Sequence, residues 1–156
     1  MRRIVLLAVV LAGLLAVPIG GGARPASFKS WSVRWSARTA RDNARVVDRC
    51  AKLFGGSDLK FGMCYVKAGR ANLRAERSAW EKQVASVIGG QSIACQRAIT
   101  AYVAAARLRQ TANLVYLDSH RRTPLTRIAG EISGEPYAAL KSASDAARAH
   151  AVAVCG

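Results

Sequence analysis

The sequence contains few of the residues from which catalytic and metal sites are built. Its 156 residues include two histidines, His120 and His150, and nine acidic residues. No P-loop, dinucleotide-binding glycine pattern, GxSxG or HExxH pattern occurs in it. Asp118 and His120 are two positions apart, so their side chains would point in different directions on a helix. We therefore expect a non-enzymatic protein with no cofactor, and a hydrolase that uses His120 or His150 is the alternative.

The cysteine patterns of redox and metal sites are also missing. The chain has four cysteines, Cys50, Cys64, Cys95 and Cys155, but no CxxC or CxxCH pattern. Their spacing matches no compact zinc site. An even number of cysteines favours two disulfides over a metal site wherever a chain leaves the reducing cytoplasm. The sequence thus predicts disulfides and no metal ligands.

Long hydrophobic runs are absent except at the N-terminus. There, Arg2 and Arg3 precede an apolar run over residues 4–17, which Pro18 ends. As a helix this run would span about 21 Å, less than the roughly 30 Å of a bilayer core. The pattern is typical of a secretory signal peptide, and an uncleaved membrane anchor is the alternative.

The residues after this run suit cleavage by signal peptidase, because Gly21 and Ala23 are small. We expect cleavage after Ala23, so that residues 1–23 are the signal peptide. Residues 24–156 would then form one periplasmic or extracellular domain without a transmembrane segment. Removing two arginines with the signal peptide lowers the net charge from +15 to +13. A surface this basic favours anionic partners.

Glycine and proline are concentrated at four breaks in a chain that is otherwise rich in Ala, Arg, Leu and Val. The breaks lie at residues 55–56, 89–90, 121–124 and 133–136. The composition between them favours helix throughout. The sequence therefore predicts an all-α protein with helices over 27–54, 58–88 and 92–120, and a divided last element over 124–132 and 136–154.

Short links between these long helices favour an antiparallel up-down-up-down bundle of about four helices. In that topology Cys50 and Cys64 lie at one end of the bundle, and Cys95 and Cys155 lie at the other. The topology therefore predicts two disulfides, Cys50–Cys64 and Cys95–Cys155.

The hydrophobic periodicity predicts which helix faces are buried. In the first helix the larger apolar side chains fall within one arc, and in the second they are spaced by sevens, as in a seam along a neighbouring helix. The predicted buried positions include Phe28, Trp35, Thr39, Val46, Cys50, Leu53 and Phe54 in the first helix, and Leu59, Met63, Val66, Leu73, Trp80, Val84 and Val87 in the second.

Basic side chains form a second periodic pattern, which we call the Arg stripe. They fall within an arc of about 80° at 100° per residue. The Arg stripe comprises Arg34, Arg38, Arg41, Arg45, Arg49 and Lys52. A second basic set on the next helix comprises Lys67, Arg70, Arg74 and Arg77.

The Arg stripe suggests a binding surface, because like charges one helical turn apart repel and a polyanion relieves that repulsion. We expect its partner to be an anionic polymer, a lipid headgroup surface or an envelope protein. The sequence shows no aromatic-basic platform for specific nucleic-acid binding. An ordinary solvated helix face is the alternative interpretation.

The middle of the chain loosely resembles a known family. Cys50 and Cys64 are followed by the segment from Leu73 to Trp80, and then by Cys95 and Tyr102. This order is similar to that of helical four-cysteine lysozyme inhibitors exported by bacteria. The chain departs from their LRxxQxxW pattern where Arg77 replaces the glutamine, its last cysteine is far downstream, and its charge would repel basic lysozymes. The resemblance implies a protein–protein module such as a secreted inhibitor, which is a further alternative.

Overall fold

The computed structural model describes residues 27–156, which form five α-helices and no strand. The predicted all-α class is confirmed. The last element is divided as predicted, because the chain becomes extended at Gly134, so the described residues form five helices and the up-down-up-down topology of four helices is not confirmed. The helices are α1 (Phe28–Phe54), α2 (Asp58–Ile88), α3 (Ile93–Ser119), α4 (Leu125–Ser133) and α5 (Tyr137–Cys155). The predicted signal peptide lies outside the described residues.

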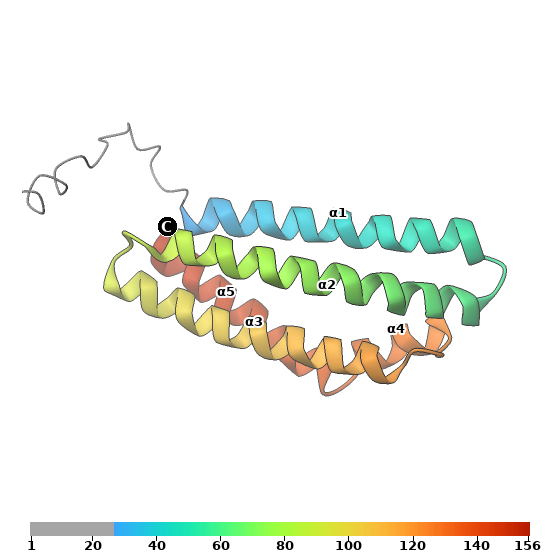
Figure 1. Ribbon diagram of the computed structural model, residues 1–156. Coiled ribbons are helices and arrows are strands. Elements are labelled where there is room, and N and C mark those ends of the chain that lie inside the picture. The colour runs from blue at the N-terminus through green and yellow to red at the C-terminus, as the bar shows by residue number, and fades with distance from the viewer. Residues whose placement is uncertain (1–26) are drawn as a thin grey trace, which may run out of the picture.

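The helices form an elongated bundle with two distinct ends (Figure 1). α1, α2 and α3 lie lengthwise beside one another, and the α1–α2 and α2–α3 turns are at opposite ends. α5 packs along α3, whereas the short α4 packs on α2 near the α1–α2 turn. We call the end with the α1–α2 turn the hairpin end and the opposite end the aromatic end.

Local hydrogen bonds explain where the helices begin. The hydroxyl oxygens of Ser27, Ser57 and Ser92 each accept from the backbone N–H three residues later, which caps α1, α2 and α3. α4 has no side-chain cap of its own. Instead, the Asp58 carboxylate of α2 accepts from the backbone N–H and the hydroxyl of Thr126, at 3.2 and 2.7 Å. This contact fixes α4 to the hairpin end of α2.

The main core lies at the aromatic end. Its buried side chains come from α1, α2, α3 and α5, and its rings meet edge to face, with 5.9 Å between the centroids of Trp80 and Tyr102. The core comprises Phe28, Trp31, Trp80, Val84, Val87, Cys95, Ala98, Ile99, Tyr102, Ala106 and Ala151. The Cys95–Cys155 disulfide, with its sulfurs 2.10 Å apart, closes this end as the topology predicts.

The hairpin end has a smaller core of Val66, Tyr116, Leu117 and Ile128. α4 can approach α2 closely only because Gly62 has no side chain: a Cβ there would overlap the backbone of Thr123. The predicted Cys50–Cys64 disulfide joins α1 to α2 at this end, with its sulfurs 2.07 Å apart.

Four predicted core positions at the hairpin end are wrong. Leu53, Phe54, Leu59 and Met63 follow the apolar periodicity of their helices, yet all four side chains are exposed. Their helices extend to the α1–α2 turn, where no other element of residues 27–156 covers them. Elsewhere the predicted face holds, since Phe28, Cys50, Val66, Trp80, Val84 and Val87 are buried.

Candidate functional site

The structure places all six members of the Arg stripe on one exposed surface of α1. Arg34, Arg38, Arg41, Arg45, Arg49 and Lys52 are each exposed to solvent. Positions between them face inward: Cys50 is buried, and Trp35 and Val46 are half-buried. The stripe therefore lies outside the packed face of α1, as its helical spacing predicts.

Little negative charge neutralises this surface. Asp42 pairs with Arg38 at 3.6 Å and with Arg45 at 3.1 Å. Within residues 27–156, no carboxylate lies within 4 Å of the other four members of the stripe, which are Arg34, Arg41, Arg49 and Lys52. Four cations on one helix face are thus free to meet an anionic partner.

An aromatic pair connects the Arg stripe to the main core. The Arg38 guanidinium lies over the Trp35 ring, 5.7 Å from its centroid, and Trp35 stacks on the buried Trp31 at 6.0 Å. The Trp31 indole N–H donates to the Gln83 side-chain oxygen of α2 at 3.4 Å. These contacts give the stripe a firm support at its N-terminal part.

The second basic set does not extend the Arg stripe. Arg70 and Arg74 pair with Asp118 of α3, and Arg77 contacts Glu81 and donates to Thr111 of α3. These three arginines therefore link α2 to α3. Lys67 alone in this set is exposed with no carboxylate within 4 Å among the described residues.

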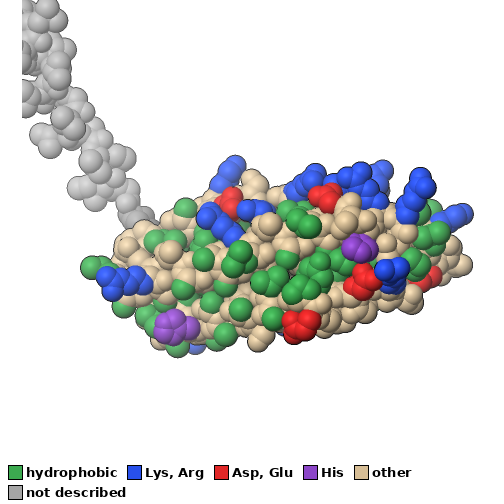
Figure 2. Space-filling model, turned by 90° about the horizontal axis from the view of Figure 1, so that it is seen from below, with side chains coloured by type: hydrophobic (Ala, Val, Ile, Leu, Met, Phe, Trp, Pro, Cys, Tyr) green, Lys and Arg blue, Asp and Glu red, His purple; other side chains and the backbone are tan. Residues whose placement is uncertain are grey.

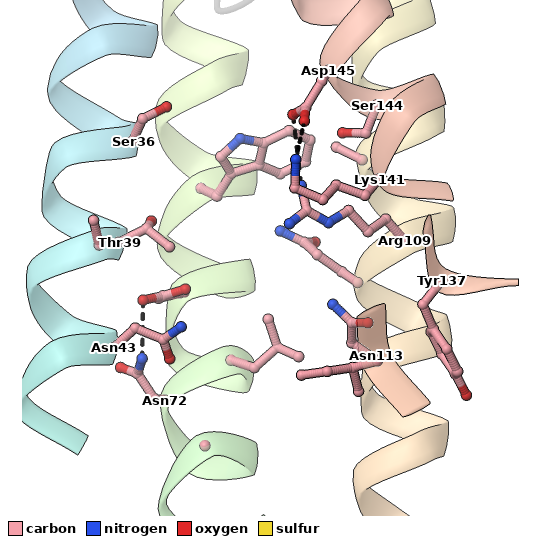
Figure 3. Close-up of a pocket in the computed structure, with 18 of the residues that line it drawn as sticks. Ser36, Thr39, Asn43, Asn72, Arg109, Asn113, Tyr137, Lys141, Ser144 and Asp145 are labelled. Atoms are coloured by element: carbon pink, nitrogen blue, oxygen red, sulfur yellow. Dashed lines mark hydrogen bonds and ion pairs between the residues drawn. The ribbon is translucent and has the colours of Figure 1, made fainter. Parts of the chain in front are cut away.

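A cleft lies between α1 on one side and α3 and α5 on the other, and the sequence analysis did not predict it. It has a volume of about 710 Å³, within the usual range of small-ligand sites. Residues of all five helices line it. Figure 3 shows Thr39 and Asn43 of α1 on one side and Arg109 and Asn113 of α3 on the other, with Lys141 and Asp145 of α5 above them.

The charged groups of the cleft are largely paired. Lys141 donates to Asp145 at 2.7 Å, and Arg109 lies 3.8 Å from the same carboxylate, so the pKa of Asp145 is held below its usual range. On the opposite side, burial raises the pKa of Glu76, although the Asn72 amide donates to its carboxylate at 3.0 Å. Charge in the cleft is therefore nearly balanced.

Two lining polar atoms have no hydrogen-bond partner within residues 27–156. They are the Thr39 hydroxyl oxygen and the Gln110 side-chain oxygen, both withdrawn from solvent. Together with the Asn43 and Asn113 amides they can bind a small ligand that carries both donors and acceptors. The sequence held one hint of this cleft: Thr39 is the polar member of the otherwise apolar arc of α1.

The two histidines are in different surroundings. His150 is exposed on α5. His120 stacks on Tyr116 at 4.0 Å, its Nε2 lies 3.4 Å from Glu131, and its Nδ1 lies 2.8 Å from the Tyr116 carbonyl oxygen. A carbonyl oxygen only accepts, so Nδ1 carries a proton and donates to it. Nδ1 cannot then act as a base for the Ser119 hydroxyl 3.2 Å away.

Tyr116 and Glu131 join α3 to α4 beside His120. The Tyr116 hydroxyl donates to Glu131 at 2.8 Å, and Arg127 donates to the other carboxylate oxygen at 2.6 Å. The hydrogen bonds from Arg127 and Tyr116 lower the pKa of Glu131, while burial and the bond to Glu131 raise that of Tyr116. This cluster connects helices at the hairpin end.

No family model matches the chain, and no curated protein or solved structure matches it. In the described part of the chain, no group of three or more His, Cys, Asp or Glu side chains is placed to hold a metal ion. None of the helices over residues 27–156 has the length and apolar character required to cross a bilayer.

Proposed function

We propose that the protein is an exported, non-enzymatic binding protein that uses the Arg stripe to hold an anionic component of the cell envelope. The observation that carries this proposal is the exposure of all six stripe cations, four of them without a carboxylate within 4 Å among residues 27–156. The partner is an anionic polymer or the headgroup surface of anionic lipids.

The length of the stripe suits a repetitive partner. From Arg34 to Lys52 the helix rises roughly 27 Å, so the stripe can meet several charges of a polyanion at once. Partner charges close to these side chains also offset the repulsion between neighbouring arginines. Because the cations are exposed, their attraction weakens as the ionic strength rises.

The test compares two triple charge reversals in the exported protein. Arg34→Glu, Arg41→Glu and Arg49→Glu change three unpaired stripe residues. Lys29→Glu, Lys82→Glu and Arg97→Glu make the same charge change near the aromatic end. All six residues are exposed, and none has a carboxylate within 4 Å in the described structure, so neither variant breaks an ion pair there.

We expect the wild-type protein to bind a heparin column and anionic vesicles at low salt. Loss of three stripe contacts should flatten the slope of log affinity against log salt by about two to three, whereas the control variant should change it little. If both variants weaken binding equally, net charge is the whole effect and the Arg stripe is not a site. If the wild type binds neither probe, the alternatives of a protein-binding module or a hydrolase take precedence.

A further inference from the structure

Exposed hydrophobic side chains gather at the hairpin end. Five large apolar residues lie on both sides of the α1–α2 turn, with 37–59% of each side chain exposed. We call this set the apolar tip: Val47, Leu53, Phe54, Leu59 and Met63. Exposed apolar side chains that lie close together can form an interaction surface.

The apolar tip sits on a fixed scaffold. The Cys50–Cys64 disulfide links the two helices just before the turn. Within the turn, the Gly55 N–H donates to the Ala51 carbonyl oxygen at 2.8 Å, and the Ser57 N–H donates to that of Phe54 at 2.9 Å. Few conformations of the turn are therefore lost when a partner covers it, which favours binding.

Cations surround the apolar tip. The exposed side chains of Arg45, Arg49 and Lys52 flank it on α1, and Lys60 flanks it on α2. Arg45, Arg49 and Lys52 also line a shallow hollow with Leu53 and Asp48. The other nearby carboxylate, Asp58, is engaged with Thr126 of α4. Figure 2 views the bundle from the side opposite α1, where Asp and Glu side chains lie among the Lys and Arg side chains.

We propose that the apolar tip inserts into the surface of an anionic lipid bilayer while the surrounding cations bind its headgroups. Apolar side chains bordered by Lys and Arg are the combination that interfacial membrane binding requires. An anionic polymer in water would satisfy the cations but leave Leu53, Phe54 and Leu59 in solvent. This inference rests on the proposed function and identifies its partner as lipid.

The experiment removes the apolar tip without changing charge. The tip variant carries Leu53→Ser, Phe54→Ser and Leu59→Ser. Its control carries Ile93→Ser, Leu108→Ser and Val115→Ser, three α3 residues that are at least as exposed. Co-sedimentation is measured with vesicles of phosphatidylglycerol mixed with phosphatidylcholine and with pure phosphatidylcholine, and heparin affinity is measured in parallel.

We expect the tip variant to bind the anionic vesicles at least about tenfold more weakly than wild type, because three apolar side chains no longer enter the interface. Its heparin affinity should stay within about twofold, and the control variant should match wild type in both assays. Compared with wild type, which already contains Trp31, Trp35 and Trp80, Phe54→Trp should add emission that is blue-shifted on anionic vesicles and quenched by brominated lipid, whereas Ile93→Trp should not.

The outcomes separate this inference from the proposed function. If wild type binds heparin but not anionic vesicles, or if the tip and control variants bind the vesicles equally, the inserted tip is wrong and the Arg stripe still stands. If wild type binds neither heparin nor anionic vesicles, the proposed function fails as well.

Discussion

The two ends of the bundle use hydrophobic side chains in opposite ways. At the aromatic end, Phe28, Trp80 and Ile99 are almost completely buried among four helices. At the hairpin end, Leu53, Phe54 and Leu59 are exposed beside a core of only four residues. The aromatic end therefore buries more apolar side chains than the hairpin end, which leaves apolar and cationic side chains exposed.

The largest expected effect comes from removing a core side chain at each end. Trp80→Ala should lower the free energy of unfolding by about 5 kcal/mol, and Ile128→Ala by about 3 kcal/mol, because both side chains are buried but Trp80 contacts the larger core. Urea denaturation followed by circular dichroism measures both. A greater loss for Ile128→Ala would reverse the assignment of the main core to the aromatic end.

Loss of the disulfide at the aromatic end should destabilise the fold more than loss of the disulfide at the hairpin end. Both effects should be somewhat smaller than that of Trp80→Ala. Replacing Cys95 and Cys155 by Ala opens a loop with a sequence separation of 60, and replacing Cys50 and Cys64 opens one of 14. By loop-closure entropy these changes cost about 4 and about 3 kcal/mol. Thermal unfolding of each double variant would measure the loss of stability.

Hydrogen exchange distinguishes local from global effects of these disulfide variants. Loss of Cys50–Cys64 should speed exchange mainly around the α1–α2 turn, since the main core lies at the other end. Loss of Cys95–Cys155 should speed exchange throughout α3 and α5. Uniform acceleration in both variants would contradict a division between the two ends.

Sequence reasoning was most successful where local chemistry decides the structure. Ser27 and Ser92 cap helices within a residue of the predicted starts, and the cysteine pairs follow from which helix ends meet. The position of the Arg stripe also follows from helical spacing alone. Periodicity identifies a face of a helix, however, and does not say whether another element covers that face. It therefore places Leu53 and Leu59 in the core, although both are exposed.

The cleft and the basic set of α2 could not be predicted for a related reason. The sequence places Arg70 and Arg74 on a charged surface, but in the structure both pair with Asp118 of α3. Thr39 and Gln110 border one cleft only because packing places α1 and α3, two helices distant in sequence, on either side of it. The amides in the cleft follow no motif.

The smallest expected effect is a pH dependence that opens the hairpin end before the aromatic end. Arg127 and Tyr116 hydrogen bonds lower the pKa of Glu131 in the folded state. A carboxyl whose folded pKa is depressed stabilises the fold above its ordinary pKa, and this contribution is lost as the pH falls through the folded value. Below the ordinary range of glutamate, α4 should therefore open first, because Glu131 joins it to Tyr116 of α3. The pKa of Asp145 is lowered too, but its main partner Lys141 lies on the same helix, so its protonation should not release α5 from the main core.

Amide exchange within α4 and tryptophan emission report the two ends separately, because Trp31, Trp35 and Trp80 all belong to or pack against the main core. On acidification, exchange in α4 should rise while the tryptophan emission stays constant. Glu131→Gln should already show fast α4 exchange at neutral pH and should lose the acid dependence, because an amide cannot bind Arg127 as a carboxylate does. If the tryptophan emission and α4 exchange change together in wild type, the two ends unfold as one unit and their separation at acid pH is wrong.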